Sequence, residues 1–234
     1  MFLLNMDSLV SSQQLEAFIV SLKTASVSIL LTFFLGILAA YFVLKIKDKR
    51  LKTLWDILFT LPLVLPPTVL GFFLLYLLGV NRPIGKFFID VFSFQITFSW
   101  IATVIAAVVV SFPLMYRSAR GAFEQVDPNM IYAAKTLGLS EWKIFWKIIF
   151  PLALPGIVSG GILAFARGLG EFGATSMIAG NIARKTRTLP LAVYSAVAGG
   201  RMGEAWGYVV IIVIIAFIAI GLMNYFAYKE KRIK

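Results

Sequence analysis

The chain has 234 residues, of which 60% are hydrophobic and 14% are charged, so its composition is that of a polytopic membrane protein rather than of a soluble domain. It has neither cysteine nor histidine, which excludes disulfides, thiol chemistry and histidine-based catalysis or metal binding, and we expect neither a metal nor a cofactor. The net charge of +11 could indicate a nucleic-acid partner, but the basic residues lie between apolar runs and at the C-terminus, where they set membrane topology, so we expect none.

Five apolar runs are long enough to cross the hydrocarbon core, and all must be helical because lipid cannot satisfy open backbone groups. This predicts an all-α polytopic membrane protein with about five transmembrane helices and no separate soluble domain. No positively charged segment and no small-residue cleavage site precede the first run, so we expect a retained span rather than a signal peptide. The second run contains Pro62, Pro66 and Pro67, so we expect a kink or an irregular turn there. The runs cover approximately residues 17–44, 54–79, 97–119, 148–178 and 205–228.

The distribution of lysine and arginine predicts the orientation, because cytoplasmic segments of membrane proteins carry the excess of these residues. We expect the N-terminus outside and the C-terminus in the cytoplasm. The expected cytoplasmic cations are Lys45, Lys47, Lys49, Arg50, Lys52, Arg117, Arg120, Lys135, Lys143, Lys147, Lys229, Lys231, Arg232 and Lys234, and the fewer on the opposite side are Arg82, Lys86, Arg184, Lys185, Arg187 and Arg201.

The segment between the third and fourth runs, about residues 120–151, mixes charges, aromatic residues and helix signals. Asp127 can cap a helix whose first position suits Pro128, and Gly138 is a natural helix stop. Ser140 can cap a second short helix. We therefore expect a short amphipathic helix displayed on the membrane surface. Its apolar stripe consists of Met130, Ile131, Ala133, Ala134 and Leu137.

This segment resembles the coupling loop of ABC-importer permeases, the EAA motif: Glu-Ala-Ala, three residues, Gly, nine residues, then Ile-x-Leu-Pro. Tyr132-Ala133-Ala134, Gly138 and Ile148-Ile149-Phe150-Pro151 have this spacing, with Tyr132 in place of glutamate and Phe150 in place of leucine. The resemblance implies a helix that inserts into a groove of a separate ATPase, whereas the alternative is an ordinary interfacial connector. The implied coupling residues are Asp127, Met130, Tyr132, Ala133, Ala134, Thr136, Leu137 and Gly138.

The chain has no nucleotide-binding loop of its own. Gly79–Lys86 has one residue too many between its glycines, and Phe87 stands where Ser or Thr should bind magnesium. We therefore expect no enzymatic activity in this chain, and any ATP hydrolysis must come from a partner chain.

The fourth run carries the only charges well inside a membrane segment, Arg167 and Glu171. Four positions separate them, so on a continuous helix they could pair on one face. Gly170 and Gly173 permit close packing or local unwinding beside them. Two interpretations remain open: these four residues line the pathway or form its gate, or the charged pair is structural and locks this span to a neighbour.

The stretch Phe165–Ala174, FARGLGEFGA, is similar to a segment shared by sulfate and molybdate permeases. Leu61–Leu75, LPLVLPPTVLGFFLL, resembles the second span of molybdate permeases more closely than that of sulfate permeases. Ser21-Leu22-Lys23 and Ser111-Phe112-Pro113-Leu114 also fit the molybdate group, so the resemblance covers about residues 15–228.

The resemblance implies that residues 1–234 form one permease domain of the type I ABC-importer (MetI-like) fold in the cytoplasmic membrane. It further implies a homodimer, surrounded by membrane lipid, with two cytoplasmic ATPase subunits and an extracytoplasmic molybdate-binding protein, which imports molybdate by alternating access. Sulfate and tungstate remain alternative substrates. A membrane enzyme is disfavoured because no acidic pair shares a predicted face inside a span. A channel would not need a helix with the importer spacing.

Four basic residues run against the positive-inside pattern, in the outer segment between the fourth and fifth runs. One hypothesis is that they attract a divalent oxyanion or an acidic face of the binding protein. The alternative is that a loop of this length simply tolerates charge. The four residues are Arg184, Lys185, Arg187 and Arg201.

Overall fold

The computed structural model describes residues 12–231, with side chains described to residue 225. The predicted absence of a signal peptide concerns residues 1–11, which lie outside the described residues, as do the tail cations Arg232 and Lys234. The regular structure of residues 12–231 is helical, as the composition predicts. The helices are α1 (Ser12–Lys45), α2 (Lys49–Val64), α3 (Pro67–Leu78), α4 (Pro83–Phe92), α5 (Trp100–Glu124), α6 (Pro128–Thr136), α7 (Glu141–Ile144), α8 (Phe150–Leu169), α9 (Gly173–Ala179), α10 (Leu189–Ala198) and α11 (Met202–Lys231), with a π-helical turn over Phe145–Ile149.

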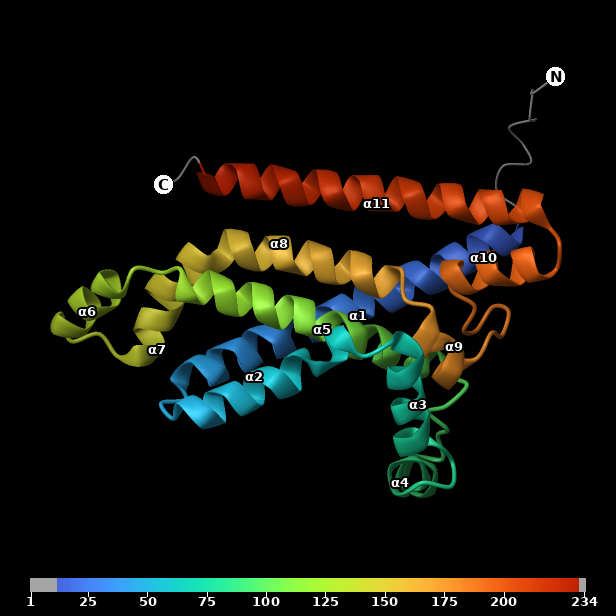
Figure 1. The fold of residues 1–234 in the computed structure, drawn as a ribbon, viewed down its shortest axis with the longest axis horizontal. Coiled ribbons are helices and arrows are strands. Elements are labelled where there is room, and N and C mark those ends of the chain that lie inside the picture. The colour runs from blue at the N-terminus through green and yellow to red at the C-terminus, as the bar shows by residue number, and fades with distance from the viewer. Residues whose placement is uncertain (1–11, 232–234) are drawn as a thin grey trace.

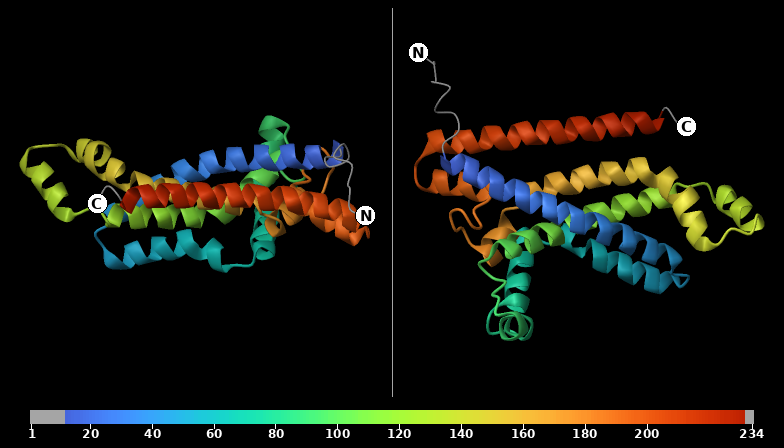
Figure 2. Two further views of the ribbon diagram at one scale, coloured as in Figure 1. Left: turned by 90° about the horizontal axis from the view of Figure 1, so that it is seen from above. Right: turned by 180° about the vertical axis from the view of Figure 1, so that it is seen from behind.

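The long helices α1, α5, α8 and α11 run along the long axis of the molecule (Figure 1). The helices α6 and α7 lie at one end, where α11 also finishes, and α10 lies at the other; we call these the α6 end and the α10 end. Figure 2 shows the same arrangement from above and from behind. Four helices in the described residues are long and apolar enough to cross a membrane, and the pair α2–α3 counts as a fifth span if its bend is included. This agrees with the predicted number of about five.

The predicted irregularity in the second run is a sharp break between α2 and α3, whose axes differ by 111°. Leu65 is extended, as expected for a residue before proline, and its carbonyl therefore leaves the helical path. Pro67 then starts α3 in the first helical turn, where a missing N–H costs nothing. Two consecutive prolines thus turn one apolar run into two helices, and α3 extends away from the bundle (Figure 1).

The prediction of a continuous fourth span over 148–178 is wrong at its C-terminal end. The helix α8 stops at Leu169, Gly170 is its C-terminal cap, and the short helix α9 begins at Gly173. Three glycines in this stretch weaken helix continuation, so the local unwinding that they permit does occur. At its other end the span begins earlier than predicted, because α7, the π-helical turn and α8 follow one another without a break.

The centre of the bundle is α5, which packs against both α1 and α8, and these two helices also contact each other at Ser28 and Gly168. Hydroxyl pairs connect α1 to α5: Thr24 and Thr103 at 2.9 Å, and Thr32 and Ser111 at 3.1 Å. Between α5 and α8, Gly156 faces Ala122 so closely that a Cβ on Gly156 would lie 2.9 Å from the alanine Cβ. Small residues therefore set the helix spacing, as is typical of membrane bundles.

Two helices were not predicted from the sequence, α4 and α10. Each has ten residues, which is too short to cross the membrane and too short to stand out from a neighbouring apolar run. As far as residue 231, the basic segments that were assigned to the cytoplasm lie at the α6 end: at the start of α2, around α6 and α7, and at the end of α11 (Figure 1). The order of the helices thus places these three segments on the same side.

The crossing of α3 over α9 should depend on Gly71. A Cβ at this position would lie 2.7 Å from the Met177 Cβ and 2.8 Å from the Ala174 Cα. We expect Gly71→Ala to lower the free energy of unfolding by about 1–3 kcal/mol through overpacking. The measurement is the thermal unfolding midpoint of the purified protein in detergent. Gly221→Ala is the matched control, because among the described residues no heavy atom outside its own stretch of helix backbone lies within 4 Å of that Cβ position. Equal midpoints for the two variants would contradict the prediction.

Candidate coupling helix and buried ion pair

The helix α6 has the capping signals that the sequence predicts. The Asp127 carboxylate accepts a hydrogen bond from the Asn129 N–H at 2.9 Å, and Pro128 occupies the first turn. At the other end Gly138 has a φ of +74°, a left-handed conformation that favours glycine. Its N–H donates to the Lys135 carbonyl at 2.9 Å. Local chemistry therefore fixes both ends of α6.

The predicted apolar stripe of α6 is largely unpacked against the rest of the chain. Ala134 is buried and Ile131 is half-buried, but Met130 is 50% exposed and Leu137 is 81% exposed. Tyr132, at the position of the motif glutamate, is 63% exposed. The other implied coupling residues, Asp127, Ala133, Thr136 and Gly138, are also exposed. Since α6 projects from the end of the bundle (Figure 1), this apolar surface is available to a partner.

Aromatic packing fixes the base of the α6–α7 segment to the bundle. The buried Phe145 ring lies 4.3 Å from the Tyr41 ring of α1 and 5.6 Å from the Phe123 ring of α5, measured between centroids. An ion pair between Lys45 and Glu141, 3.4 Å apart, joins the end of α1 to the start of α7. The projecting helix is therefore attached to two spans, α1 and α5, as well as to α8, which follows it directly.

The charges of the fourth run form the predicted ion pair, with Arg167 Nη1 2.9 Å from Glu171 Oε2. The geometry differs from the expected helical turn, because Glu171 lies beyond the end of α8. Its Oε1 accepts a hydrogen bond from the Ala174 N–H at 2.7 Å, which caps the start of α9. Glu171 is 2% exposed, whereas the Arg167 side chain is 33% exposed. One carboxylate thus joins the end of α8 to the beginning of α9.

The two glycines named with this pair have different roles. Gly170 ends α8 and is exposed. Gly173 is buried, and a Cβ on it would lie 3.0 Å from the Pro67 Cβ and 3.2 Å from the Thr68 nitrogen. Gly173 therefore allows α9 to approach the start of α3, next to the proline break.

A second charged cluster, which sequence reasoning missed, joins α2 to α5 at the α6 end. The Tyr116 hydroxyl donates to Asp56 at 2.9 Å, and Arg120 forms an ion pair with the same carboxylate. Arg120 Nε also donates to Glu124 at 3.0 Å, and Lys52 lies 3.6 Å from Glu124. The only local signal is the spacing of Arg120 and Glu124, which are four residues apart on one helix.

The basic residues of the segments that flank α10 are mostly paired. Arg184 lies 2.9 Å from Glu16 of α1, and Arg187 donates to the Asn181 side chain at 2.8 Å. Arg201 lies 2.9 Å from Glu204. Lys185 is exposed. The structure therefore places these residues in the segments that flank α10, but three of them already have polar partners within the chain.

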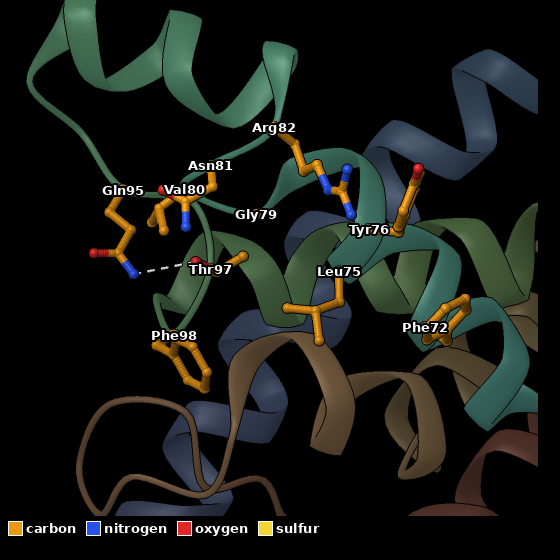
Figure 3. Close-up of a pocket in the computed structure, with 10 residues that line it drawn as sticks. All are labelled: Phe72, Leu75, Tyr76, Gly79, Val80, Asn81, Arg82, Gln95, Thr97 and Phe98. Carbon is orange, nitrogen blue, oxygen red and sulfur yellow. Dashed lines mark hydrogen bonds between the residues drawn. The ribbon is translucent and has the colours of Figure 1, made fainter.

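A cavity of about 480 Å³ lies between α3, the start of α4 and the segment before α5 (Figure 3). The Arg82 guanidinium stacks 3.9 Å above the Tyr76 ring centroid on one side of it. On the other side Gln95 donates to the Thr97 hydroxyl at 3.1 Å. The cavity combines a cation with neutral polar groups, and it is formed by the helices that the proline break turns away from the bundle.

The ion pair of Arg167 and Glu171 should contribute more to stability than an exposed pair. We expect Glu171→Ala to lower the free energy of unfolding by about 3 kcal/mol, because it leaves Arg167 without its partner and α9 without its cap. Glu204→Ala, which breaks the exposed pair with Arg201, should cost less than about 1 kcal/mol. Thermal unfolding of both variants in detergent checks this, and a smaller effect at Glu171 than at Glu204 would refute it.

Comparison with known proteins identifies the family. A family model described as the binding-protein-dependent transport system inner membrane component matches residues 32–233. YvgM of Bacillus subtilis (strain 168) is 42% identical over 225 residues, which cover 96% of this chain and 97% of that protein. The molybdenum transport system permease protein ModB of Escherichia coli (strain K12) is 44% identical over 192 residues, covering 81% of this chain and 83% of ModB.

A solved structure, that of the inward-facing MetNI methionine ABC transporter, contains a chain of the same fold. The TM-score is 0.66 at 15% identity, and the match covers 93% of this chain and 99% of that one. This confirms the predicted MetI-like importer-permease fold. The chain is therefore a multi-pass membrane protein that belongs to the family of inner membrane components of binding-protein-dependent transport systems.

Proposed function

We propose that this chain is the membrane-spanning permease of an ATP-driven molybdate importer. The name and the 44% identity of the ModB relative support the choice of molybdate. The observation that carries the coupling part of the proposal is the projecting helix α6, whose Met130, Tyr132 and Leu137 are at least half exposed. Since this family consists of the membrane components of transport systems, ATP hydrolysis belongs to a separate chain.

The mechanism that fits this arrangement is alternating access. Closure of an ATPase dimer on ATP brings two copies of α6 together, and the spans attached to them open to the outside to receive the anion from a binding protein. ATP hydrolysis releases the coupling helices, and the pathway opens to the cytoplasm. The α6 end is then cytoplasmic, which is consistent with the basic segments gathered there.

Within this mechanism we assign Arg167 and Glu171 to anchoring rather than to transport of the anion. The Glu171 carboxylate is 2% exposed, and both of its oxygens already have contacts, one with Arg167 and one with the Ala174 N–H. A carboxylate would also repel an oxyanion. The pair instead holds the break between α8 and α9 in one geometry.

The same argument applies to the outer basic residues. The contacts of Arg184 with Glu16 and of Arg187 with Asn181 favour a role in fastening the segment before α10. Lys185 remains the best candidate for attraction of an anion or of an acidic binding protein, since it is exposed in the same segment.

We further propose that the permease works as a homodimer, with two ATPase subunits. Along the most apolar part of α11 only 11% of the residues are buried inside the chain, and α2 buries none of its residues. Much helix surface is thus left for lipid and for a second copy.

The mass of the complex in lipid nanodiscs should correspond to two permeases and two ATPases; a transport-competent complex with a single permease would disprove this.

Coupling should depend on the exposed apolar face of α6. We expect Leu137→Asp to reduce ATP-dependent uptake at least tenfold, because a charge would enter the apolar contact with the ATPase. Uptake into proteoliposomes and retention of the ATPase during purification measure this. Leu51→Asp is the matched control: Leu51 is 46% exposed at the same end, in the first turn of α2, where an acidic residue is tolerated. Full activity of the Leu137 variant would argue against the coupling role.

Substrate choice is tested by uptake of labelled molybdate in cells with and without this chain. We expect deletion to abolish high-affinity uptake, and excess tungstate but not sulfate to compete in cells that contain the chain. Expression of the chain with its ATPase from a plasmid is the control for the deletion. Loss of sulfate uptake with molybdate uptake intact would assign the permease to sulfate and leave the coupling argument standing.

A further inference from the structure

The helix α2 is joined to α5 near the α6 end by two charged contacts that lie one helical turn apart. Asp56 of α2 accepts a hydrogen bond from the Tyr116 hydroxyl at 2.9 Å and forms an ion pair with Arg120. One turn nearer the α6 end, Lys52 Nζ lies 3.6 Å from Glu124 Oε1. On each helix the two charged residues are four positions apart and therefore share a face. We call these four residues the α2–α5 charge ladder.

Arg120 is the centre of this ladder. Its guanidinium pairs with Asp56, donates from Nε to Glu124 at 3.0 Å and donates from Nη1 to the Tyr116 hydroxyl at 3.3 Å. Its side chain is 19% exposed, so solvent screens these contacts less than it screens an isolated surface pair. Two contacts one turn apart also oppose sliding and rotation of α2 against α5, whereas a single contact would allow α2 to pivot.

The side-chain contacts of α2 with α5 are concentrated in the half of α2 nearer the α6 end. Next to the ladder, the Phe59 ring lies 5.3 Å from the Tyr116 ring, measured between centroids. Beyond Phe59 the helix is largely uncovered, because Leu61, Leu63 and Val64 are at least 43% exposed. The helix α2 buries none of its residues, so apolar packing holds it less firmly than it holds α5. The ladder therefore carries much of the attachment of α2 to α5.

The ladder lies between the candidate coupling helix and the proline break. Arg120 and Glu124 belong to the last two turns of α5, and α6 begins four residues later at Pro128. On the other side of the ladder, α2 continues to the break at Pro66 and into α3, which crosses α9 at Gly71. A displacement of α6 thus acts on the end of α5, and the ladder connects that end to α2 and α3.

We propose that the α2–α5 charge ladder transmits movement of α6 to α3, with Asp56 and Arg120 as positioning residues for transport. The inference rests on the proposed coupling role of α6. The alternative is that the ladder only stabilises the folded bundle. In that case its loss lowers the thermal unfolding midpoint but leaves the uptake per ATP hydrolysed unchanged in the complexes that remain folded.

The first test measures uptake of labelled molybdate and ATP hydrolysis by the permease–ATPase complex in the same proteoliposomes, with excess binding protein. We expect Asp56→Ala to lower the uptake per ATP hydrolysed by about fivefold or more, because α2 no longer follows α5. The matched control is Asp48→Ala. Asp48 is exposed and caps the same helix by accepting from the Leu51 N–H at 2.9 Å, but it does not belong to the ladder. Its removal should leave this ratio unchanged.

An unchanged ratio in folded Asp56→Ala complexes would overturn the proposal. A covalent link then distinguishes transmission from a contact that must open. The chain has no cysteine, so Asp56→Cys combined with Arg120→Cys gives each copy one pair of thiols for a short bismaleimide linker, used with a cysteine-free ATPase. We expect the unlinked double variant to be uncoupled and the linked one to recover more than about half of the wild-type ratio. Linked complexes that hydrolyse ATP without uptake would contradict transmission.

A third readout does not depend on the transported anion. Spin labels are attached in separate samples to Leu77→Cys in α3 and to Gln125→Cys at the end of α5, and both positions are exposed. The distance between the labels of the two copies is measured with and without ATP. In the otherwise wild-type complex we expect ATP to change both distances. With Asp56→Ala, the distance between the Gln125 positions should still change and that between the Leu77 positions should not.

Failure of the proposed function is recognised separately. No effect of ATP at Gln125 in the otherwise wild-type complex would reject the coupling role of α6, and this inference with it. Equal effects of ATP at Leu77 with and without Asp56→Ala would reject the ladder and keep the coupling role. Absence of molybdate uptake together with an Asp56-dependent response at Leu77 would reject the substrate and keep the ladder.

Discussion

The close contact of α5 with α1 and α8 is the constraint on which the rest of the structure depends. Lipid offers no hydrophobic drive for helices to associate, so they must pack through small residues and hydrogen bonds. Thr24 with Thr103 and Thr32 with Ser111 join α1 to α5, and each pair has the same sequence separation of 79. The two helices therefore run in the same direction and in register. Glycines of α8 likewise bring its backbone close to α5 at Gly156 and Gly160.

Helix breaks then determine where the remaining elements lie, and each break has a local chemical cause. Two prolines end α2 and start α3, and a carboxylate with neighbouring glycines ends α8 and starts α9. The broken ends meet, because Gly173 lies against Pro67 and Gly71 lies against α9. Two helix breaks in distant parts of the chain thus stabilise each other. The short helices α3 and α9 are each too short to be stable through their own hydrogen bonds, and the contact between them supplies the additional stability.

These features explain which parts could be predicted from the sequence. The ends of α6 follow from Asp127, Pro128 and Gly138, because capping depends only on neighbours along the chain. The number of spans follows from hydropathy. In contrast, the ion pair of Asp56 with Arg120 joins two helices, so no local pattern could indicate it. Arg167 and Glu171 were correctly paired but wrongly placed on one continuous helix, since periodicity alone does not show that Glu171 caps the next one.

The antiparallel helices α5 and α8 are the two spans between which the proposed coupling helix lies in the chain. The segment that joins them carries α6, so a force on α6 acts first on these two helices. The two helices pack closely, since a Cβ on Gly160 would collide with the Ser118 side chain. The π-helical turn at Phe145–Ile149 precedes Pro151, whose missing N–H already weakens the helical hydrogen bonding there. A small rotation at this point would shift α8 relative to α5. Movement of the coupling helix would then act on the close packing of α8 against α5, where Gly156 faces Ala122.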